Sequence, residues 1–216
     1  MRHYLRLSSL FLLLFASCSA PYKGLKQQPP TQSVYRFEPQ FDRVLYRGIV
    51  DGRFIFKKFH LSGVLFFKQL ENGTKRAIFQ NEMGIAFFDL EWDKDNNFKV
   101  RQVIPQLDKE AVLKTLRKDM EMVLMIGMDK KSEILLTGDR GKQQLYRLNR
   151  EEGYVYYTTE GNELVKIENT NNRKAVVSVE VGRKETVTSM PDTLLFNHHK
   201  ANFTISLTKI ERNVNE

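Results

Sequence analysis

Hydrophobic and polar residues alternate along most of the chain after Gln40, which is typical of strands in an antiparallel sheet. The segment Phe59–Lys68 is the clearest case. One side of that expected strand carries Phe59, Leu61, Gly63, Leu65 and Phe67, and the other carries His60, Ser62 and Lys68. Such a strand buries one face and keeps the other in water. The pattern therefore predicts a β-rich domain.

Polar turns divide this part of the chain into about eleven expected strands, whereas Ser132–Gly141 is predicted to be irregular. The expected strands are Arg53–Lys58, Phe59–Lys68, Arg76–Asn81, Ile85–Trp92, Phe98–Ile104, Gln143–Leu148, Tyr154–Thr159, Glu163–Glu168, Lys174–Val181, Asp192–Asn197 and Asn202–Ile210.

The hydrophobic period changes once, over Asp108–Ile126, where apolar residues recur at helical spacing. Asp108 is the expected N-cap and Gly127 the expected end. One helix is too little for the crossovers of a parallel sheet. We therefore predict a mainly β fold: a curved antiparallel half-open β-barrel of about eleven strands, with one long helix covering the open side.

The first residues form a leader, expected to be a signal peptide over residues 1–17. A basic stretch precedes the apolar run Leu10–Ala16, which is too short to cross a hydrocarbon core of ~30 Å. Phe15-Ala16-Ser17-Cys18 resembles the lipobox of bacterial lipoproteins, which implies cleavage before Cys18 and attachment of acyl chains such as palmitate to it. Cys18 is the only cysteine, so no disulfide and no Cys-ligated metal site is expected.

Residues 18–40 are predicted to be an extended tether, and residues 41–216 a single domain. Four of the six prolines lie between Ser19 and Gln40, and a chain of that length spans at most ~70 Å. In lipoprotein families, an aspartate after the lipidated cysteine favours the inner membrane, and an acidic cluster there marks surface display in Bacteroidetes. Here Cys18 is followed by Ser19 and not by an aspartate, and no acidic cluster lies near it. The resemblance therefore implies lipid anchoring at the periplasmic face of the outer membrane.

Charge and chemistry narrow the function classes. The net charge of +8 becomes +6 when Arg2 and Arg6 leave with the leader, and the remaining charges are interspersed, so no nucleic acid is expected as a partner. Asp93–Asn97 lacks the glycine of a calcium loop. His198 and His199 are adjacent in an expected strand and would point to opposite faces, and no nucleophile motif is present. We expect no enzyme activity, no metal and no cofactor.

A broader resemblance rests on three features: the expected strand Phe59–Lys68, the expected helix in mid-chain, and the C-terminal segment Pro191–Leu207. Together with secretion and lipidation, these features resemble the LolA/LolB superfamily of outer-membrane lipoprotein carriers and suggest a Bacteroidetes-type member. The resemblance implies a half-open barrel that binds lipid or lipoprotein acyl chains. No sequence counterpart of the leucine-tipped loop that releases cargo in one family carrier is found.

The resemblance implies a hydrophobic cavity between the sheet and the helix. Its expected residues are Leu61, Leu65, Phe67, Phe79, Phe88, Leu116, Met120 and Val123. Small residues such as Gly63 favour open space, whereas the aromatic residues favour a filled interior. Two functions therefore stay open: a periplasmic module that binds acyl chains or lipoproteins, and a non-catalytic structural lipoprotein with a filled core that presents a surface to an envelope complex.

Overall fold

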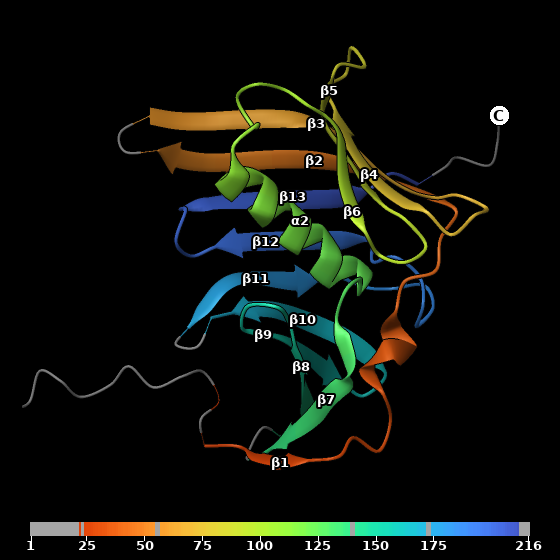
Figure 1. The fold of residues 1–216 in the computed structure, drawn as a ribbon. Coiled ribbons are helices and arrows are strands. Elements are labelled where there is room, and N and C mark those ends of the chain that lie inside the picture. The colour runs from red at the N-terminus through yellow and green to blue at the C-terminus, as the bar shows by residue number, and fades with distance from the viewer. Residues whose placement is uncertain (1–21, 23, 55–56, 139–140, 172–173, 212–216) are drawn as a thin grey trace, which may run out of the picture.

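The computed structural model describes residues 22, 24–54, 57–138, 141–171 and 174–211. Cys18 and the leader therefore lie outside the described residues. Thirteen strands form one antiparallel sheet that curves around the single described α-helix, α2 (Glu110–Leu124) (Figure 1). Among the described residues, no helix is long and apolar enough to cross a membrane.

The strands follow one another in the sheet in the order β1-β7-β8-β9-β10-β11-β12-β13-β2-β3-β4-β5-β6. Their bounds are β1 Lys26–Gln28, β2 Arg43–Phe54, β3 Lys57–Gln69, β4 Lys75–Gln80, β5 Ala86–Trp92, β6 Phe98–Val103, β7 Asp129–Thr137, β8 Gln143–Asn149, β9 Tyr154–Glu160, β10 Glu163–Thr170, β11 Ala175–Val181, β12 Thr193–His198 and β13 Phe203–Lys209. A 3-10 helix, η2, spans Val34–Phe37.

This architecture confirms the predicted half-open barrel. The sheet ends at β1 on one side and at β6 on the other, and these two strands do not pair, so the barrel is open. Helix α2 lies in front of the concave face, which β4, β5 and β6 partly wrap (Figure 1). The predicted alternation is also found, because Ile205 and Leu207 of β13 are buried while Thr208 is exposed.

Three strand assignments from the sequence were wrong. Ser132–Gly141 is largely strand β7, whose apolar end at Leu135 and Leu136 is buried, and only its polar start breaks register with β8. The two ends of the expected strand Arg53–Lys58 instead belong to different strands, because Arg53 of β2 pairs with Lys58 of β3. Most of β2 escaped prediction because Gly48 and Gly52 interrupt its hydrophobic pattern.

Part of the expected tether belongs to the fold. Lys26–Gln28 pairs with β7 as an edge strand. Val34 and Phe37 of η2 are fully buried in the main hydrophobic cluster. The Ser33 side chain caps η2, and the Glu133 carboxylate of β7 accepts hydrogen bonds from Ser33 and from the Val34 amide. The domain therefore takes in residues well before position 41.

The helix begins one residue later than expected, and it ends at Leu124, two residues before the expected Ile126. The amide of Asp108 donates to Ile104, so Asp108 still belongs to the preceding turn. Lys109 is the N-cap and makes no side-chain capping bond. At the other end, Met125 adopts a left-handed conformation and Gly127 has a positive φ of 67°, which stops the helix before β7.

Candidate functional site

The eight residues expected to line a cavity all join one hydrophobic cluster between the sheet and α2. The partly buried members are Leu61 and Leu116, at the edge of the cluster. The buried members are Leu65, Phe67, Phe79, Phe88, Met120 and Val123. The structure therefore brings the predicted residues together, but six of them are buried inside the cluster.

The space expected at Gly63 is filled by an aromatic ring. Gly63 of β3 faces Gly48 of β2 in the register of the sheet. The Phe79 ring of β4 lies over both glycines, because a Cβ atom on either one would be 3.0 Å from its Cε2 atom. The glycines thus admit a phenylalanine into the sheet surface instead of leaving a void.

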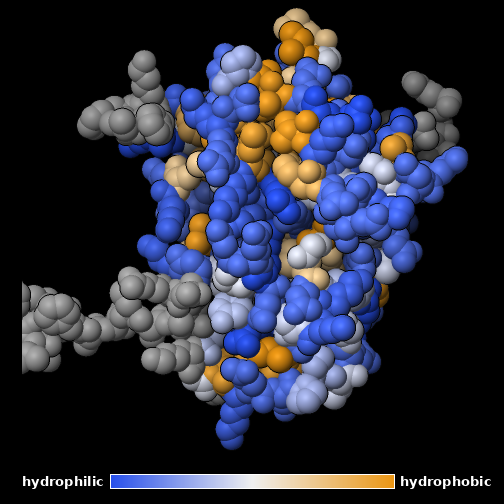
Figure 2. Space-filling model, viewed as in Figure 1, coloured by the Kyte–Doolittle hydropathy of each residue, from blue (hydrophilic) through white to orange (hydrophobic). Residues whose placement is uncertain are grey.

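Burial changes along α2. Every side chain from Asp119 to Leu124 is buried, whereas Val112, Leu113 and Leu116 in the first half are only half-buried. Figure 2 shows hydrophobic side chains reaching the surface beside this first half, next to β5 and β6. Half-buried apolar residues at the edge of the cluster include Leu61, Phe87, Val103, Leu107 and Leu116. The apolar interior is therefore closed under the second half of α2 and incompletely covered under the first.

The second half of α2 is fixed to the sheet by a buried carboxylate. Glu121 pairs with Arg150 at 2.5 Å and with Arg117 at 2.7 Å, and it accepts a hydrogen bond from the indole of Trp92 at 3.1 Å. Both Glu121 and Arg150 side chains are almost fully buried. In addition, the Tyr157 hydroxyl donates to the Met122 carbonyl at 2.9 Å. These bonds link α2 to three different strands or turns.

The first half of α2 is held by weaker interactions. Lys114 and Lys118 both pair with Glu152, in the turn between β8 and β9, at 2.7 and 2.8 Å. Their hydrogen bonds lower the pKa of Glu152 to about 2. Because Glu152 and Lys114 are exposed, water and salt screen these pairs and reduce their contribution to stability.

The turn between β4 and β5 carries exposed hydrophobic side chains. The Asn81 side-chain oxygen accepts hydrogen bonds from the amides of Met83 and Ile85, and Gly84 has a φ of 81°. This geometry fixes the turn and leaves Met83 82% exposed and Ile85 55% exposed. In Figures 1 and 2 the turn projects from the top of the molecule as a hydrophobic tip. The sequence predicted only a polar turn here.

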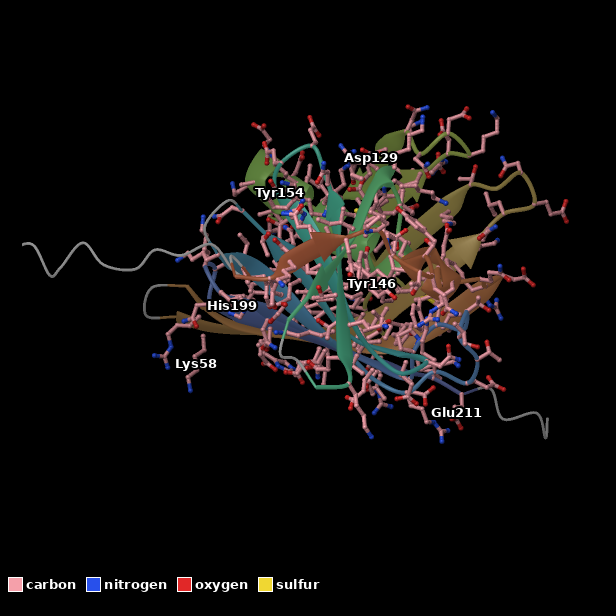
Figure 3. All side chains as sticks on the ribbon, turned by 90° about the horizontal axis from the view of Figure 1, so that it is seen from below. Lys58, Asp129, Tyr146, Tyr154, His199 and Glu211 are labelled. Carbon is pink, nitrogen blue, oxygen red and sulfur yellow. The ribbon has the colours of Figure 1, made fainter. Side chains whose placement is uncertain are left out.

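The two adjacent histidines point to opposite faces, as expected. His198 Nε2 lies 2.7 Å from the Asp119 carboxylate beneath α2, whereas His199 Nε2 lies 3.1 Å from the Ser178 hydroxyl. Figure 3 places His199 and Lys58 on the same side of the molecule. Among the described residues, no group of three histidine, cysteine, aspartate or glutamate side chains could hold a metal ion.

The residues between Asp93 and Asn97 form a hairpin turn. The Asp93 carboxylate accepts hydrogen bonds from the amides of Asp95 and Asn97 and from the Asn97 side chain. These bonds lower the pKa of Asp93. The carboxylate thus stabilises the turn between β5 and β6.

Sequence reasoning missed Asp119 and Glu121, although one signal was present. Asp119 lies three residues after Leu116 and four before Val123, so it falls on the apolar face of the helix. A charge at such a position requires a buried partner. Glu121 has one partner nearby in sequence, Arg117, but its buried partners Arg150 and Trp92 are far away in sequence, so no comparable signal identified its burial.

Comparisons with known proteins bear on the fold. In the sequence comparisons, no family model and no curated protein matches the chain. Among solved structures, the chain is similar to a LolA superfamily protein from Nitrosomonas europaea, with a TM-score of 0.51, 7% identity, and coverage of 82% of this chain and 88% of that one.

Two further structures match with lower TM-scores. A domain assigned to outer membrane lipoprotein sorting in Vibrio parahaemolyticus has a TM-score of 0.48, 8% identity and coverage of 83% and 89%. A DUF1329 family protein from Desulfovibrio piger has a TM-score of 0.44, 7% identity and coverage of 81% and 87%. Three observations show that the chain has the LolA-like half-barrel fold that its sequence resemblance implied. They are the order of the strands, the position of α2 over the concave face, and the similarity to the Nitrosomonas protein.

Proposed function

We propose that this chain is a lipid-anchored protein of the bacterial envelope that binds an acyl chain between α2 and the concave face of its sheet. The uneven burial of α2 carries this proposal. Its first half covers apolar residues incompletely and is held by screened ion pairs, whereas its second half is fixed by Glu121. A displacement of the first half would admit an apolar ligand without unfolding the sheet.

The driving force for such binding is the removal of apolar area from water, worth roughly 25 cal/mol per Å². No catalytic group is required, which suits a binding module. The LolA-like fold supports this function, since the Nitrosomonas relative carries the LolA name. In this proposal the protein is anchored through Cys18 at the periplasmic face of the outer membrane, and a lipoprotein acyl chain or an envelope complex is its partner.

The hydrophobic tip at Met83 and Ile85 supports a role at a membrane. A side chain as exposed as Met83 gains free energy when it enters the boundary between lipid head groups and acyl chains. The tip and the apolar surface beside α2 lie on the same upper part of the molecule (Figure 2). A ligand could thus pass between the bilayer and the interior over a short path.

One observation favours the second candidate, a structural lipoprotein with a filled core. Phe79 fills the space above Gly48 and Gly63, and Met120 and Val123 are buried against the sheet. If α2 does not move, this interior admits no ligand. The protein would then act through its surface, within an envelope complex.

Displacement of a fluorescent fatty acid tests the two candidates. The chain from Tyr22 onward, which contains every strand of the described sheet, is titrated with the probe, and a thermal melt checks that it is folded. We expect binding at micromolar concentration. Leu116→Gln should weaken binding roughly tenfold, since burying an uncompensated amide costs about 1–3 kcal/mol.

Glu110→Gln introduces the same side chain at an exposed position of α2 and is the matched control, so its affinity should equal that of the wild type. Met120→Gln probes the fully buried stripe. If the folded wild-type chain binds no acyl probe, the result supports the structural lipoprotein and contradicts the acyl-binding function. Equal binding by folded Leu116→Gln would place the ligand on another surface.

A further inference from the structure

A patch of apolar side chains lies on the convex face of the sheet, the face opposite α2. In Figure 1, where α2 lies in front of the sheet, this face is turned away from the viewer. Leu45 of β2, Phe66 of β3 and Ile78 of β4 lie directly opposite one another in the register and form one row across three strands. All three are half-buried, and none belongs to either hydrophobic cluster. Apolar neighbours on the same face are Ile49, Val64, Leu195 and Ile210. We call these residues the outer patch, because an apolar surface that extends over several strands and is bordered by polar residues is typical of an interaction site.

A row of cations borders the outer patch. Arg43, Lys68 and Arg76 lie directly opposite one another on β2, β3 and β4, two residues along each strand from the apolar row. Like charges in directly opposite positions destabilise a sheet. Arg76 is paired with Asp89, whereas Arg43 and Lys68 are exposed and form no ion pair within the described residues. Arg47 adds an exposed cation on the other side of the apolar row. The cations therefore cost the fold stability, and an anionic partner would remove that cost.

The N-terminal segment packs against the same face of the sheet. Tyr22 and Leu25 contact Tyr156 of β9 and its apolar neighbours on β7 and β8. Paired residues of successive strands connect β9 to β2 along one face: Tyr156, Glu168, Ser178, Asn197, Thr204 and Asp51. Asp51 and Leu45 are an even number of residues apart on β2, so they point to the same side of the sheet. The described start of the chain therefore lies on the face that carries the outer patch.

The charge of the outer patch decides among three kinds of partner. A second copy of the chain would bring the same cations together across a two-fold axis, which is unfavourable. An acidic protein would match the charge. A bilayer with anionic phospholipid matches it too, since its surface offers phosphate groups above an apolar interior. The bilayer is favoured because the N-terminal segment, which leads to the proposed anchor at Cys18, packs against the same face.

We propose that the outer patch binds the surface of a bilayer that contains anionic phospholipid, so that the convex face of the sheet lies on the membrane. The cations contact the phosphates, and Phe66 and its apolar neighbours enter the boundary between head groups and acyl chains. β4 leads from Ile78 to the exposed tip at Met83 and Ile85, which enters the bilayer at the edge of the same contact. This inference goes beyond acyl binding and rests on the proposed function only for the lipid anchor.

Flotation with vesicles tests the contact without an anchor. The chain from Tyr22 onward, which carries no lipid, is mixed with vesicles of dioleoyl phosphatidylcholine, either alone or with an equal amount of dioleoyl phosphatidylglycerol. A thermal melt checks that the chain is folded. We expect binding at low salt to be at least tenfold tighter to the vesicles with phosphatidylglycerol. This binding should weaken as salt is added, because salt screens exposed charges.

The full lipidated chain provides a second measurement. With Cys18 acylated, Phe66→Cys places the only free thiol of the mature chain in the outer patch. A polarity-sensitive dye on this thiol should shift its emission to shorter wavelength in vesicles with phosphatidylglycerol and not in vesicles of phosphatidylcholine alone. Lys109→Cys, at the exposed start of α2 on the other side of the sheet, is the control and should report water in both. Ile49→Cys replaces Phe66→Cys if that variant fails to fold.

Removal of charge distinguishes the outer patch from the net charge of the domain. Arg43→Gln combined with Lys68→Gln removes two cations beside the patch and should weaken binding to phosphatidylglycerol vesicles at least tenfold. Lys109→Gln combined with Lys174→Gln removes the same charge at exposed positions elsewhere, so the affinity of this matched control should stay within roughly twofold of the wild type. Lys68→Gln alone should not lower the melting temperature, because Lys68 lies between two cations in the sheet.

Equal binding of the folded chain to both kinds of vesicle, equal dye emission in both, or equal loss of binding in the two double variants overturns the proposal. No vesicle binding by a folded chain overturns it as well and leaves the convex face to an acidic protein. Self-association of the lipid-free chain that Phe66→Cys abolishes would instead assign the face to a second copy. Vesicle binding without displacement of the fluorescent fatty acid would remove the acyl-binding function and keep this inference, whereas the reverse result would remove this inference alone.

Discussion

Two glycines let an aromatic ring pack directly against the backbone of the sheet. Gly48 and Gly63 face each other on neighbouring strands, and Phe79 lies over both. The two positions differ in what surrounds them. A Cβ atom at Gly63 would lie 2.2 Å from the Gln80 carbonyl oxygen, whereas at Gly48 the nearest atoms belong to the side chains of Phe79 and Leu207. The Gln80 carbonyl is fixed by the pairing of β3 with β4, whereas the side chains of Phe79 and Leu207 can rotate away.

We therefore predict that Gly63→Ala destabilises the fold by about 3 kcal/mol or more, because β3 and β4 must separate to admit the methyl group. Gly48→Ala, in the same pair, should cost roughly 1 kcal/mol, since the Phe79 ring can shift by a few tenths of an ångström. Urea denaturation of both variants measures the difference. Equal urea midpoints for the two variants would contradict the close approach of β3 and β4 at Gly63.

At the scale of elements, α2 is one helix with two kinds of attachment. Buried groups fix its second half, and screened ion pairs hold its first half. The difference follows from position: Glu121 meets Trp92 and Arg150 below the helix, whereas Glu152 meets Lys114 and Lys118 in water. The proposed entry of a ligand depends on this asymmetry.

Glu121→Gln should destabilise the protein by about 3–5 kcal/mol, because it leaves the buried Arg150 guanidinium without a carboxylate. Glu152→Gln makes the same change in the exposed pair and should leave the denaturation midpoint within experimental error. Hydrogen exchange adds a local measurement: in the wild type, the amides of the first half of α2 should exchange faster than those of the second half. Similar losses in the two variants would contradict the asymmetry.

At the scale of the molecule, the position of the N-terminal segment limits how far the domain can stand from a membrane. The sequence predicted a tether that reaches Gln40, yet Tyr22 and Leu25 pack against a small cluster of β7–β9 residues, and Lys26–Gln28 pairs with β7. Only a few residues separate Tyr22 from Cys18. If Cys18 carries the lipid, Tyr22 lies within roughly 15 Å of the bilayer surface. Since β1 and the turn between β4 and β5 lie at opposite ends of the molecule (Figure 1), the anchor and the hydrophobic tip reach the same bilayer only when the domain lies along its surface.

Cys18→Ala tests the anchor. We expect the wild-type protein to sediment with the outer membrane and to incorporate a clickable fatty acid, and the variant to remain unprocessed and unlabelled, because the thiol is the proposed site of acylation. Cys18→Ala that incorporates as much label as the wild type would refute lipidation at Cys18. Labelling of the wild type at a peptide other than the one containing Cys18 would lead to the same conclusion.

The sequence by itself determined the class of fold and most of its elements. Alternation at period two identified β3 and β13, and the change to helical spacing identified α2, because both signals come from residues that are neighbours in the chain. The cluster between sheet and helix followed for the same reason, since each element shows its apolar face in its own residues. The eight residues expected there do meet.

Only the tertiary structure decided how that interior is filled and what lies beside it. Phe79 reaches Gly48, Asp119 reaches His198, and Glu121 reaches Arg150 across the sheet and the helix. The short polar strand β1 was hidden for a related reason: it is held by pairing with β7 and not by its own hydrophobicity. Contacts between residues far apart in the chain depend on the order in which the thirteen described strands pair and on the curvature of their sheet, and both are decided by segments that are distant in sequence.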